Sequence, residues 1–134
     1  MPVGARQILI TTATPGLTIA IVEDDDAMRR SIERLLHANG YATEAFAGAE
    51  AFLASGVATR VKGLVLDIHL PGISGIELQR QLRASGSTLP VIFITAFDEP
   101  ATRVEALAAG CVGYLRKPFT AGELAEALGR VVAA

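Results

Sequence analysis

The chain has 134 residues and a mass of 14.0 kDa, enough for one domain with a buried core. Hydrophobic residues make up 51% of it and charged residues 19%, which excludes a disordered chain. The formal net charge of −2 gives no basis for direct binding to nucleic acid, and no apolar run reaches the roughly 18 residues of a membrane span. The single cysteine, Cys111, cannot form an internal disulfide, which suits a reducing cytoplasm.

We interpret residues 1–16 as a loose N-terminal tail. They contain one arginine and one short apolar patch, Ile8–Ile10, so they make a poor signal peptide. Residues 17–134 are then assigned to a single domain.

The first half of this domain predicts three strands and two helices. Short apolar or β-branched runs predict buried strands at Leu17–Val22 and Gly63–Asp67, and Ala42–Phe46 predicts a second, weaker strand. Between the first two, apolar residues recur at spacings of three and four, which predicts an amphipathic helix: Met28, Ile32, Leu35 and Leu36. Asn39-Gly40 ends that helix, and Ala49–Ser55 predicts a short second helix that ends at Gly56.

A third helix and a fourth strand follow. The helix begins at Ser74, with Glu77 three residues on to complete a capping box, and it ends near Gly86. The strand is Pro90–Thr95, whose sequence PVIFIT is the clearest strand pattern in the chain.

The end of the chain predicts two more helices around a short strand, Val112–Leu115. The acids Asp98–Glu99 and the following proline predict an acid-capped helix start, and Gly110 ends that helix. Thr120 and Glu123 form a second capping box for the last helix. Four apolar residues of this helix are expected to share one face: Leu124, Leu128, Val131 and Val132.

Five strands that alternate with five helices predict an α/β domain with a doubly wound parallel sheet, covered by helices on both faces. Right-handed crossovers leave few topologies for such a chain. The best fit is the flavodoxin-like (βα)5 fold with strand order 2-1-3-4-5.

Polar residues follow the predicted strands at the edge where open α/β sheets bind ligands. Glu23 and Asp24 follow the first strand, Asp67 ends the third, Thr95 ends the fourth, and Lys117 lies just after the fifth. The first and third strands are neighbours at the point where the strand order reverses. We therefore expect three carboxylates, a hydroxyl and an ammonium to converge there.

Three neighbouring carboxylates repel one another, and a hard divalent cation removes that cost. Mg²⁺ (or Mn²⁺) prefers oxygen ligands and keeps several waters, so few direct protein ligands are needed. We assign Asp24 and Asp67 as direct ligands and Glu23 as a ligand through water. The backbone carbonyl of His69, two residues past Asp67, is a further candidate ligand.

With such a cation, Asp67 can attack a phosphoryl group and form an aspartyl phosphate. Phosphoryl transfer depends mainly on positioning and on stabilisation of charge. Lys117 offers a positive charge to one phosphoryl oxygen, and Thr95 offers a hydroxyl donor to another.

Segments at four of these strand ends resemble the response regulator receiver family, the CheY-like superfamily, and the resemblance spans about Leu17 to Val132. The segments are IVEDDDAMRR (Ile21–Arg30), LVLDIHLPGISG (Leu64–Gly75), VIFITA (Val91–Ala96) and GYLRKPFT (Gly113–Thr120). The central segments are most similar to receivers of the FixJ type, which usually precede a helix-turn-helix output domain.

The resemblance implies a role for each matched position. The acid pair falls on Glu23 and Asp24, and the phosphoacceptor falls on Asp67. The switch hydroxyl falls on Thr95, the catalytic lysine on Lys117 and the rotating aromatic on Tyr114. A cis peptide bond is expected before Pro118. It further implies that a histidine kinase or phosphotransfer protein donates the phosphoryl group with Mg²⁺. Thr95 then moves and Tyr114 follows, which remodels the face of the fourth helix, fifth strand and fifth helix, where Val104 and Leu107 lie.

The same resemblance implies a cytoplasmic signalling module, and not an enzyme that acts on a separate substrate. It is compatible with a homodimer, and with contact to DNA only through an output domain. Glu23 replaces the more usual aspartate, a variation that the family tolerates. His69 and Phe97 are bulky residues beside the phosphoryl site, where the family varies, and we expect them to affect the lifetime of the phosphate.

Other polar residues have structural explanations. Asp25–Asp26 are expected to cap the first helix, and His37 to contact the negative end of its dipole. Cys111 is expected to be a small core residue, and Arg29–Arg30 to be solvated helix charges, with contact to a kinase as the alternative. For His69, ligation of a metal through its ring is the less favoured alternative.

Three other readings remain. An adaptor that has lost phosphorylation is disfavoured by the complete residue set, and an aspartyl-phosphate hydrolase is disfavoured because His69 stands where its second aspartate is expected. A flavodoxin is disfavoured because the acidic loop after the first strand would repel phosphate. The chain could be a single-domain regulator or a receiver excised from a longer transcription factor. Its start at Met1 and its finished last helix favour the former, and the FixJ-like segments the latter.

Overall fold

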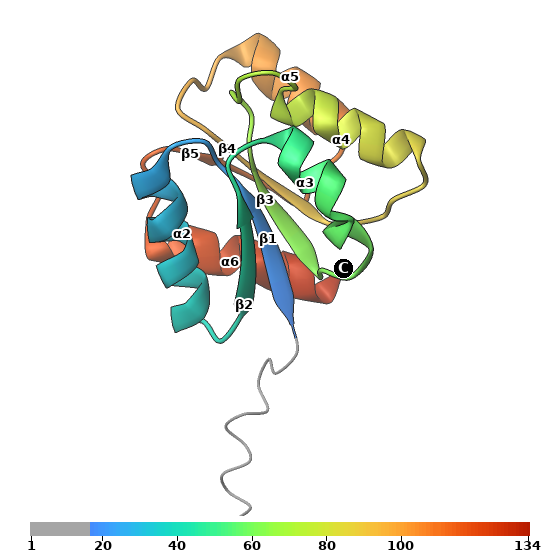
Figure 1. Ribbon diagram of the computed structural model, residues 1–134. Coiled ribbons are helices and arrows are strands. Elements are labelled where there is room, and N and C mark those ends of the chain that lie inside the picture. The colour runs from blue at the N-terminus through green and yellow to red at the C-terminus, as the bar shows by residue number, and fades with distance from the viewer. Residues whose placement is uncertain (1–16) are drawn as a thin grey trace, which may run out of the picture.

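The computed structural model describes residues 17–134, and the expected N-terminal tail lies outside the described residues. Within this range a five-stranded parallel sheet has the order β2-β1-β3-β4-β5, as predicted for a flavodoxin-like fold (Figure 1). The strands are β1 (Thr18–Val22), β2 (Ala42–Phe46), β3 (Gly63–Asp67), β4 (Val91–Thr95) and β5 (Gly113–Arg116).

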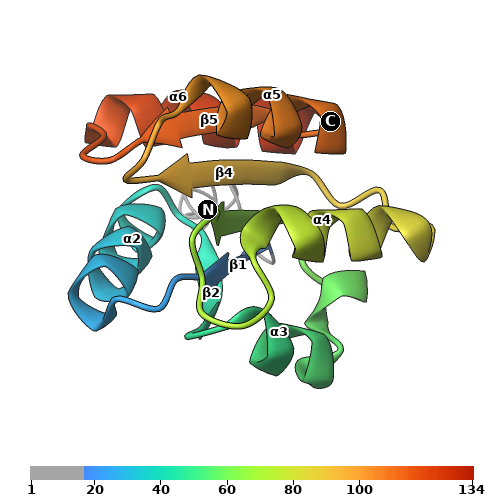
Figure 2. The ribbon, with the colours of Figure 1, turned by 90° about the horizontal axis from the view of Figure 1, so that it is seen from above.

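Five α-helices of the described region connect and cover the strands. They are α2 (Asp26–Ala38), α3 (Ala49–Ser55), α4 (Gly75–Ala84), α5 (Pro100–Ala109) and α6 (Ala121–Ala133). A 3-10 turn, Val57–Thr59, follows α3 and was not predicted. Helices α2 and α6 cover one face of the sheet, and α3, α4 and α5 cover the other (Figures 1 and 2). No helix in residues 17–134 is long and apolar enough to cross a membrane.

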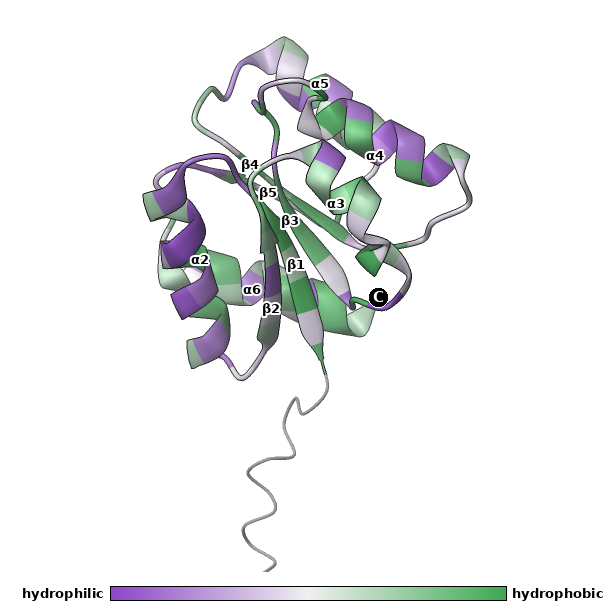
Figure 3. Cartoon of the chain, viewed as in Figure 1, coloured by the Kyte–Doolittle hydropathy of each residue, from purple (hydrophilic) through white to green (hydrophobic). Residues whose placement is uncertain are grey.

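The central strands β1, β3 and β4 are almost wholly buried, so each contributes side chains to two core layers, whereas the edge strands β2 and β5 are mostly half-buried. Ile21, Val65 and Ile92 pack in the layer under α2 and α6. Leu66 and Phe93 point to the opposite layer, under α3, α4 and α5. Strands covered in this way need apolar residues at successive positions, which explains why their sequences lack polar alternation. Figure 3 shows β1, β3 and β4 as largely hydrophobic ribbons inside more polar helices.

The register of the sheet aligns the carboxyl ends of its central strands. Val22 pairs with Leu66, so the residues that follow β1 lie beside the end of β3. On the other side of β3, Asp67 pairs with Ile94, the residue before Thr95. The polar residues singled out in the sequence therefore meet at one edge, because parallel strands all end on the same side.

The helix starts that the sequence predicts from capping residues are correct in part. Thr120 and Glu123 form both hydrogen bonds of a capping box, whereas at α4 only the Ser74 side chain accepts a bond, from the Glu77 backbone. The acid cap expected for α5 is wrong. Glu99 occupies the N-cap position without a side-chain bond. The other expected cap residue, Asp98, accepts a hydrogen bond from Tyr114 and is not free to cap the helix.

The expected apolar face of α6 is also wrong at one position. Leu124, Leu128 and Val131 are buried, but Val132 is 41% exposed. Val131 lies close to Leu124 in direction around the helix, whereas Val132 lies at the edge of the apolar stripe and is only partly covered. Val131 takes the buried position, since its side chain lies over Gly63 at the start of β3.

Two glycine substitutions test how tightly the loop after β3 is packed. A β-carbon at Gly75 would overlap the backbone carbonyl oxygen of Asp67 and lie 2.9 Å from the Ile68 Cα. We expect Gly75→Ala to lower the free energy of unfolding by roughly 2–4 kcal/mol, measured by urea titration. Gly129→Ala is the matched control, because Gly129 is an exposed residue of α6 with open space around it. That change should stabilise the protein by about 0.5–1 kcal/mol, and equal effects at the two sites would contradict the packing described.

Candidate functional site

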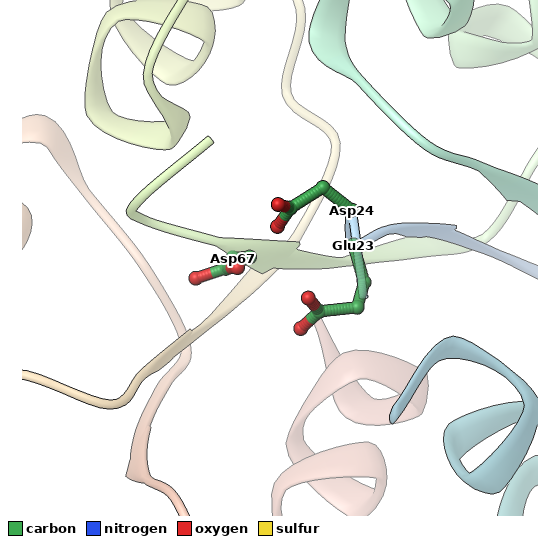
Figure 4. A group of neighbouring side chains, drawn as sticks. All are labelled: Glu23, Asp24 and Asp67. Atoms are coloured by element: carbon green, nitrogen blue, oxygen red, sulfur yellow. The ribbon is translucent and has the colours of Figure 1, made fainter. Parts of the chain in front are cut away.

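Three carboxylates meet at the ends of β1 and β3. Glu23 directly follows β1 and is 1% exposed, Asp67 is the last residue of β3 and is 3% exposed, and Asp24 is exposed. One oxygen of each side chain lies within 4.8 Å of the others. Figure 4 shows the three side chains gathered at this edge of the sheet. The convergence expected from strand order is confirmed for these residues.

Lys117 supplies the positive charge of the group. Its Nζ donates to Glu23 Oε1 at 2.7 Å and to Asp67 Oδ2 at 3.4 Å. The peptide bond between Lys117 and Pro118 is cis, as the resemblance implied. The backbone N–H of Lys117 donates to the Thr95 carbonyl at 2.8 Å, so the ends of β4 and β5 are tied together behind the ammonium.

Glu23 is held at both of its carboxylate oxygens. Oε2 accepts from the backbone N–H of Asp25 at 3.0 Å, while Oε1 accepts from Lys117. Arg29 also donates to the backbone carbonyl of Glu23 at 2.8 Å and pairs with Asp26. Arg29 is therefore not the simple solvated charge that the sequence suggested, because its guanidinium reaches back over the turn between β1 and α2.

The electrostatics of the site disfavour the ionised form of Asp67. Burial and the nearby charge of Glu23 raise the pKa of Asp67 to about 6, against the opposing effects of Lys117 and the His69 backbone N–H. Burial acts to lower the pKa of Lys117. The hydrogen bond to Glu23 and the charges of Asp67 and Glu23 outweigh burial, so this pKa lies above its ordinary value. One ammonium thus pairs with two of the three carboxylates, Glu23 and Asp67.

This donor set fits a hard divalent cation. Carboxylate oxygens are ligands that Mg²⁺ and Mn²⁺ prefer, and a cation would relieve the repulsion that raises the pKa of Asp67. Asp24 is exposed and can reach a hydrated ion. The backbone N–H of His69 donates to Asp67 Oδ1 at 3.1 Å, which fixes the start of the loop that carries the candidate carbonyl ligand.

Thr95 is buried at the end of β4, and its hydroxyl is engaged by the backbone. It donates to the Phe97 carbonyl at 3.1 Å and accepts from the Phe97 N–H at 3.0 Å. Tyr114 is half-buried on β5, and its hydroxyl donates to Asp98 at 3.0 Å. The Arg103 guanidinium lies 4.7 Å from the centre of the Tyr114 ring. Both expected switch residues therefore bind the same loop, between β4 and α5.

His69 and Phe97 form an aromatic pair across the loops that follow β3 and β4. Their rings are perpendicular, with centroids 5.0 Å apart. Both side chains are exposed, Phe97 to 59%, so the pair lies at the surface of the loops that follow Asp67 and Thr95. The sequence placed both residues beside the site, but it did not predict their contact.

Four structural interpretations can be compared with the structure. Asp25 accepts from the Met28 N–H at 2.8 Å and caps α2, as expected. His37 contacts the Thr43 hydroxyl at 2.9 Å, in addition to its place in the last turn of α2. Cys111 is half-buried and packs against the core. The one clue to Arg29 in the sequence is its spacing of three from Asp26.

The model of the response regulator receiver domain matches residues 19–129. The chain belongs to this family. Response regulator MprA of Mycobacterium avium is 44% identical over 109 residues, which are 81% of this chain and 47% of MprA. MprA of Mycobacterium tuberculosis is 45% identical over 107 residues, which are 79% of this chain and 46% of that protein. The chain thus spans about half the length of these curated relatives.

Solved receiver structures share the fold. The crystal structure of FixJ-N has a TM-score of 0.79 and 37% identity, and the match covers 87% of this chain and 94% of FixJ-N. Chemotaxis protein CheY4 of Vibrio cholerae has a TM-score of 0.78 and 26% identity, covering 86% of this chain and 98% of CheY4. The predicted likeness to CheY-like and FixJ-type receivers is confirmed, and the domain is a signalling domain of two-component systems.

The raised pKa of Asp67 predicts a pH dependence of stability without metal. Burial and Glu23 favour the protonated form in the folded state, so this group destabilises the fold as the pH rises from its ordinary pKa of about 4 to about 6. Across that window Asp67→Asn should become the more stable protein, by on the order of 1–3 kcal/mol above pH 6. Urea titrations in a chelator at several pH values measure the difference.

The matched control for this experiment is Glu77→Gln, which removes an exposed carboxylate from α4, away from the site. A difference between Asp67→Asn and wild type that stays flat or falls between about pH 4 and about pH 6 would contradict the electrostatics described.

Proposed function

We propose that this receiver domain accepts a phosphoryl group on Asp67 from a histidine kinase or a phosphotransfer protein, with Mg²⁺ or Mn²⁺ as cofactor. The observation that carries the proposal is the buried Asp67 carboxylate, with Glu23 and Asp24 oxygens within 4.8 Å and Lys117 at 3.4 Å. A bound cation would neutralise charge on the phosphoryl oxygens. Its protein ligands would be Asp24, Asp67 and the carbonyl of His69, with Glu23 acting through water.

Each side chain has a separate task in this transfer. An oxygen of Asp67 attacks phosphorus as the bond between phosphorus and the donor breaks, so the phosphoryl group passes to the carboxylate. The ammonium of Lys117 is already bonded to Asp67 and can follow the negative charge onto a phosphoryl oxygen. Glu23 holds that ammonium at 2.7 Å, which keeps it beside the acceptor before the donor binds.

The proposed switch depends on a change of partner by Thr95. Its hydroxyl is bonded to Phe97 and would turn to a phosphoryl oxygen on Asp67. Release of that loop and rotation of Tyr114 would remodel the surface of α5, β5 and α6. Val104 and Leu107 of α5 are 66% and 57% exposed there, so apolar contact area is available to a partner or output domain.

The location and the partners of the domain are proposed from its similarity to response regulators. The response regulator relatives support a cytoplasmic domain of residues 17–134 that receives a signal from a kinase and passes it on by contact. A homodimer on activation is part of this proposal, as is contact with DNA through an output domain alone. As a signalling domain, it would catalyse only its own phosphorylation and dephosphorylation.

Acetyl phosphate with Mg²⁺ tests the proposal against an adaptor that has lost phosphorylation. We expect the intact mass of the wild type to increase by one phosphoryl group, and Asp67→Asn to show no increase, because its amide is not a nucleophile. Asp26→Asn is the matched control and should gain the same mass as the wild type. Absence of a gain in the wild type, or an equal gain in Asp67→Asn, would refute phosphorylation of Asp67.

The aromatic pair predicts a long-lived phosphate. Phe97 and His69 pair on the loops that follow Asp67 and Thr95 and would shield a phosphoryl group there, so Phe97→Ala should admit water and shorten the half-life of phosphorylated Asp67 by roughly threefold or more. The mass of the phosphorylated protein after removal of acetyl phosphate measures the decay. Leu53→Ala removes a partly exposed apolar side chain from α3 and should leave the decay unchanged. An unchanged half-life in Phe97→Ala would show that the pair does not shield the phosphate.

A further inference from the structure

Glu50, in the first turn of α3, contacts the loop that follows the phosphoacceptor. Its Oε2 accepts a hydrogen bond from the backbone N–H of Ile73 at 3.0 Å, across 23 positions of sequence. The hydrogen bond from the Ile73 N–H is the main cause that lowers the pKa of Glu50, and a bond from the backbone N–H of Glu50 itself is the second. The carboxylate is therefore ionised at neutral pH. An exposed glutamate at a helix start usually needs no partner beyond the helix dipole. Glu50 instead joins α3 to a different part of the chain.

The loop passes so close to Glu50 that a side chain at Gly72 would force the Glu50 carboxylate to move. Gly72 has a φ of +77°, in the left-handed region, and a β-carbon there would lie 2.5 Å from Glu50 Oε2. The carboxylate occupies the space that a side chain would fill. The contact therefore depends on two successive loop residues. Gly72 leaves room for the carboxylate because it has no side chain, and Ile73 donates its N–H.

The same loop is fastened at both of its ends, to Asp67 at the start and to the backbone of the next residue, Ile68, at the end. At the start, the His69 N–H donates to Asp67 Oδ1 at 3.1 Å. At the end, the Gly75 N–H donates to the Ile68 carbonyl at 2.9 Å. Glu50 holds Ile73, near the end of the loop and just before the N-cap residue Ser74, so the segment between Asp67 and α4 has three anchor points.

We propose that Glu50 is a positioning residue for the cation and phosphoryl site, acting through Ile73 and Gly72 to set the place of the His69 carbonyl. This inference rests on the proposed function, because it assumes that Mg²⁺ binds at Asp67. The loop would otherwise sample several positions, and the cation would lose a preorganised ligand.

Two substitutions at Glu50 separate positioning from simple attraction of a cation by charge. Glu50→Ala removes both the acceptor and the charge, whereas Glu50→Gln removes the charge but keeps an oxygen that can accept from Ile73. We expect Glu50→Ala to weaken Mg²⁺ binding roughly three- to tenfold, less than the 10–100-fold typical of residues bonded directly to a metal ligand. Glu50→Gln should bind Mg²⁺ nearly as the wild type does. Titration calorimetry at physiological ionic strength measures each dissociation constant, and Glu126→Ala on α6 is the control for loss of an exposed glutamate.

Amide hydrogen exchange gives a second readout that needs no metal. The Ile73 N–H should exchange faster in Glu50→Ala and remain protected in Glu50→Gln, because only the alanine variant lacks an acceptor. Equal Mg²⁺ affinity in Glu50→Ala and the wild type would overturn the proposal. Equal loss of affinity in Glu50→Ala and Glu50→Gln would also overturn it, since charge alone would then explain the effect.

A pair of glycine substitutions tests the contact from the side of the loop. Gly72→Ala would displace the Glu50 carboxylate, and Gly56→Ala would place alanine at a similar φ of +73° with open space around it. Both variants should lose stability from backbone strain. Only Gly72→Ala should also weaken Mg²⁺ binding, and an equal weakening by Gly56→Ala would contradict the assignment.

The wild type in these titrations separates this inference from the proposed function. A wild-type protein that binds no Mg²⁺ and takes no phosphoryl group from acetyl phosphate would overturn both. If the wild type does both and Glu50→Ala is unchanged, only the role of Glu50 fails.

Discussion

The ion pair network of Lys117 with Glu23 and Asp67 is the constraint on which the rest of the structure depends. Two buried carboxylates lie next to each other, and one ammonium bonds to both at 2.7 and 3.4 Å. Buried charges of this kind are expensive unless they are paired and hydrogen-bonded. Here the pairing is incomplete, since Asp24 adds a third carboxylate and the pKa of Asp67 stays raised to about 6. The site is thus left short of positive charge, which is the condition for binding a cation.

The sheet topology keeps this arrangement in place. Lys117 and Glu23 are 94 positions apart, yet they meet because parallel strands end at the same edge. The strand order reverses between β1 and β3, so the turn after β1 is free to bend over the end of β3. Apolar side chains on both faces of the strands then fix the register, because a slip of one residue would move each side chain to the wrong core layer.

The sequence predicted well what depends on periodicity and strand order. The bounds of β2, β3 and α3 were correct, and so was the convergence of Glu23, Asp67 and Lys117. Contacts between loops could not be predicted, since they depend on backbone paths that no local pattern encodes. Glu50 is an example: its sequence neighbours indicate only a helix start, while its partner Ile73 lies 23 residues away. Asp98 resembled a helix cap for the same reason, and its true partner Tyr114 lies on β5.

The loop between β4 and α5 connects the site to the exposed face of α5. Thr95 holds Phe97 by two hydrogen bonds, and the next residue, Asp98, accepts from Tyr114 and pairs with Arg103. If Thr95 turns to a phosphoryl group, Phe97 loses both bonds at once, and Asp98 must either carry Tyr114 with it or release it. A small change of one hydroxyl would therefore alter contacts on both β5 and α5. Coupling of this kind would need no long pathway, because the partners of Thr95 and Tyr114, Phe97 and Asp98, are neighbours in one loop.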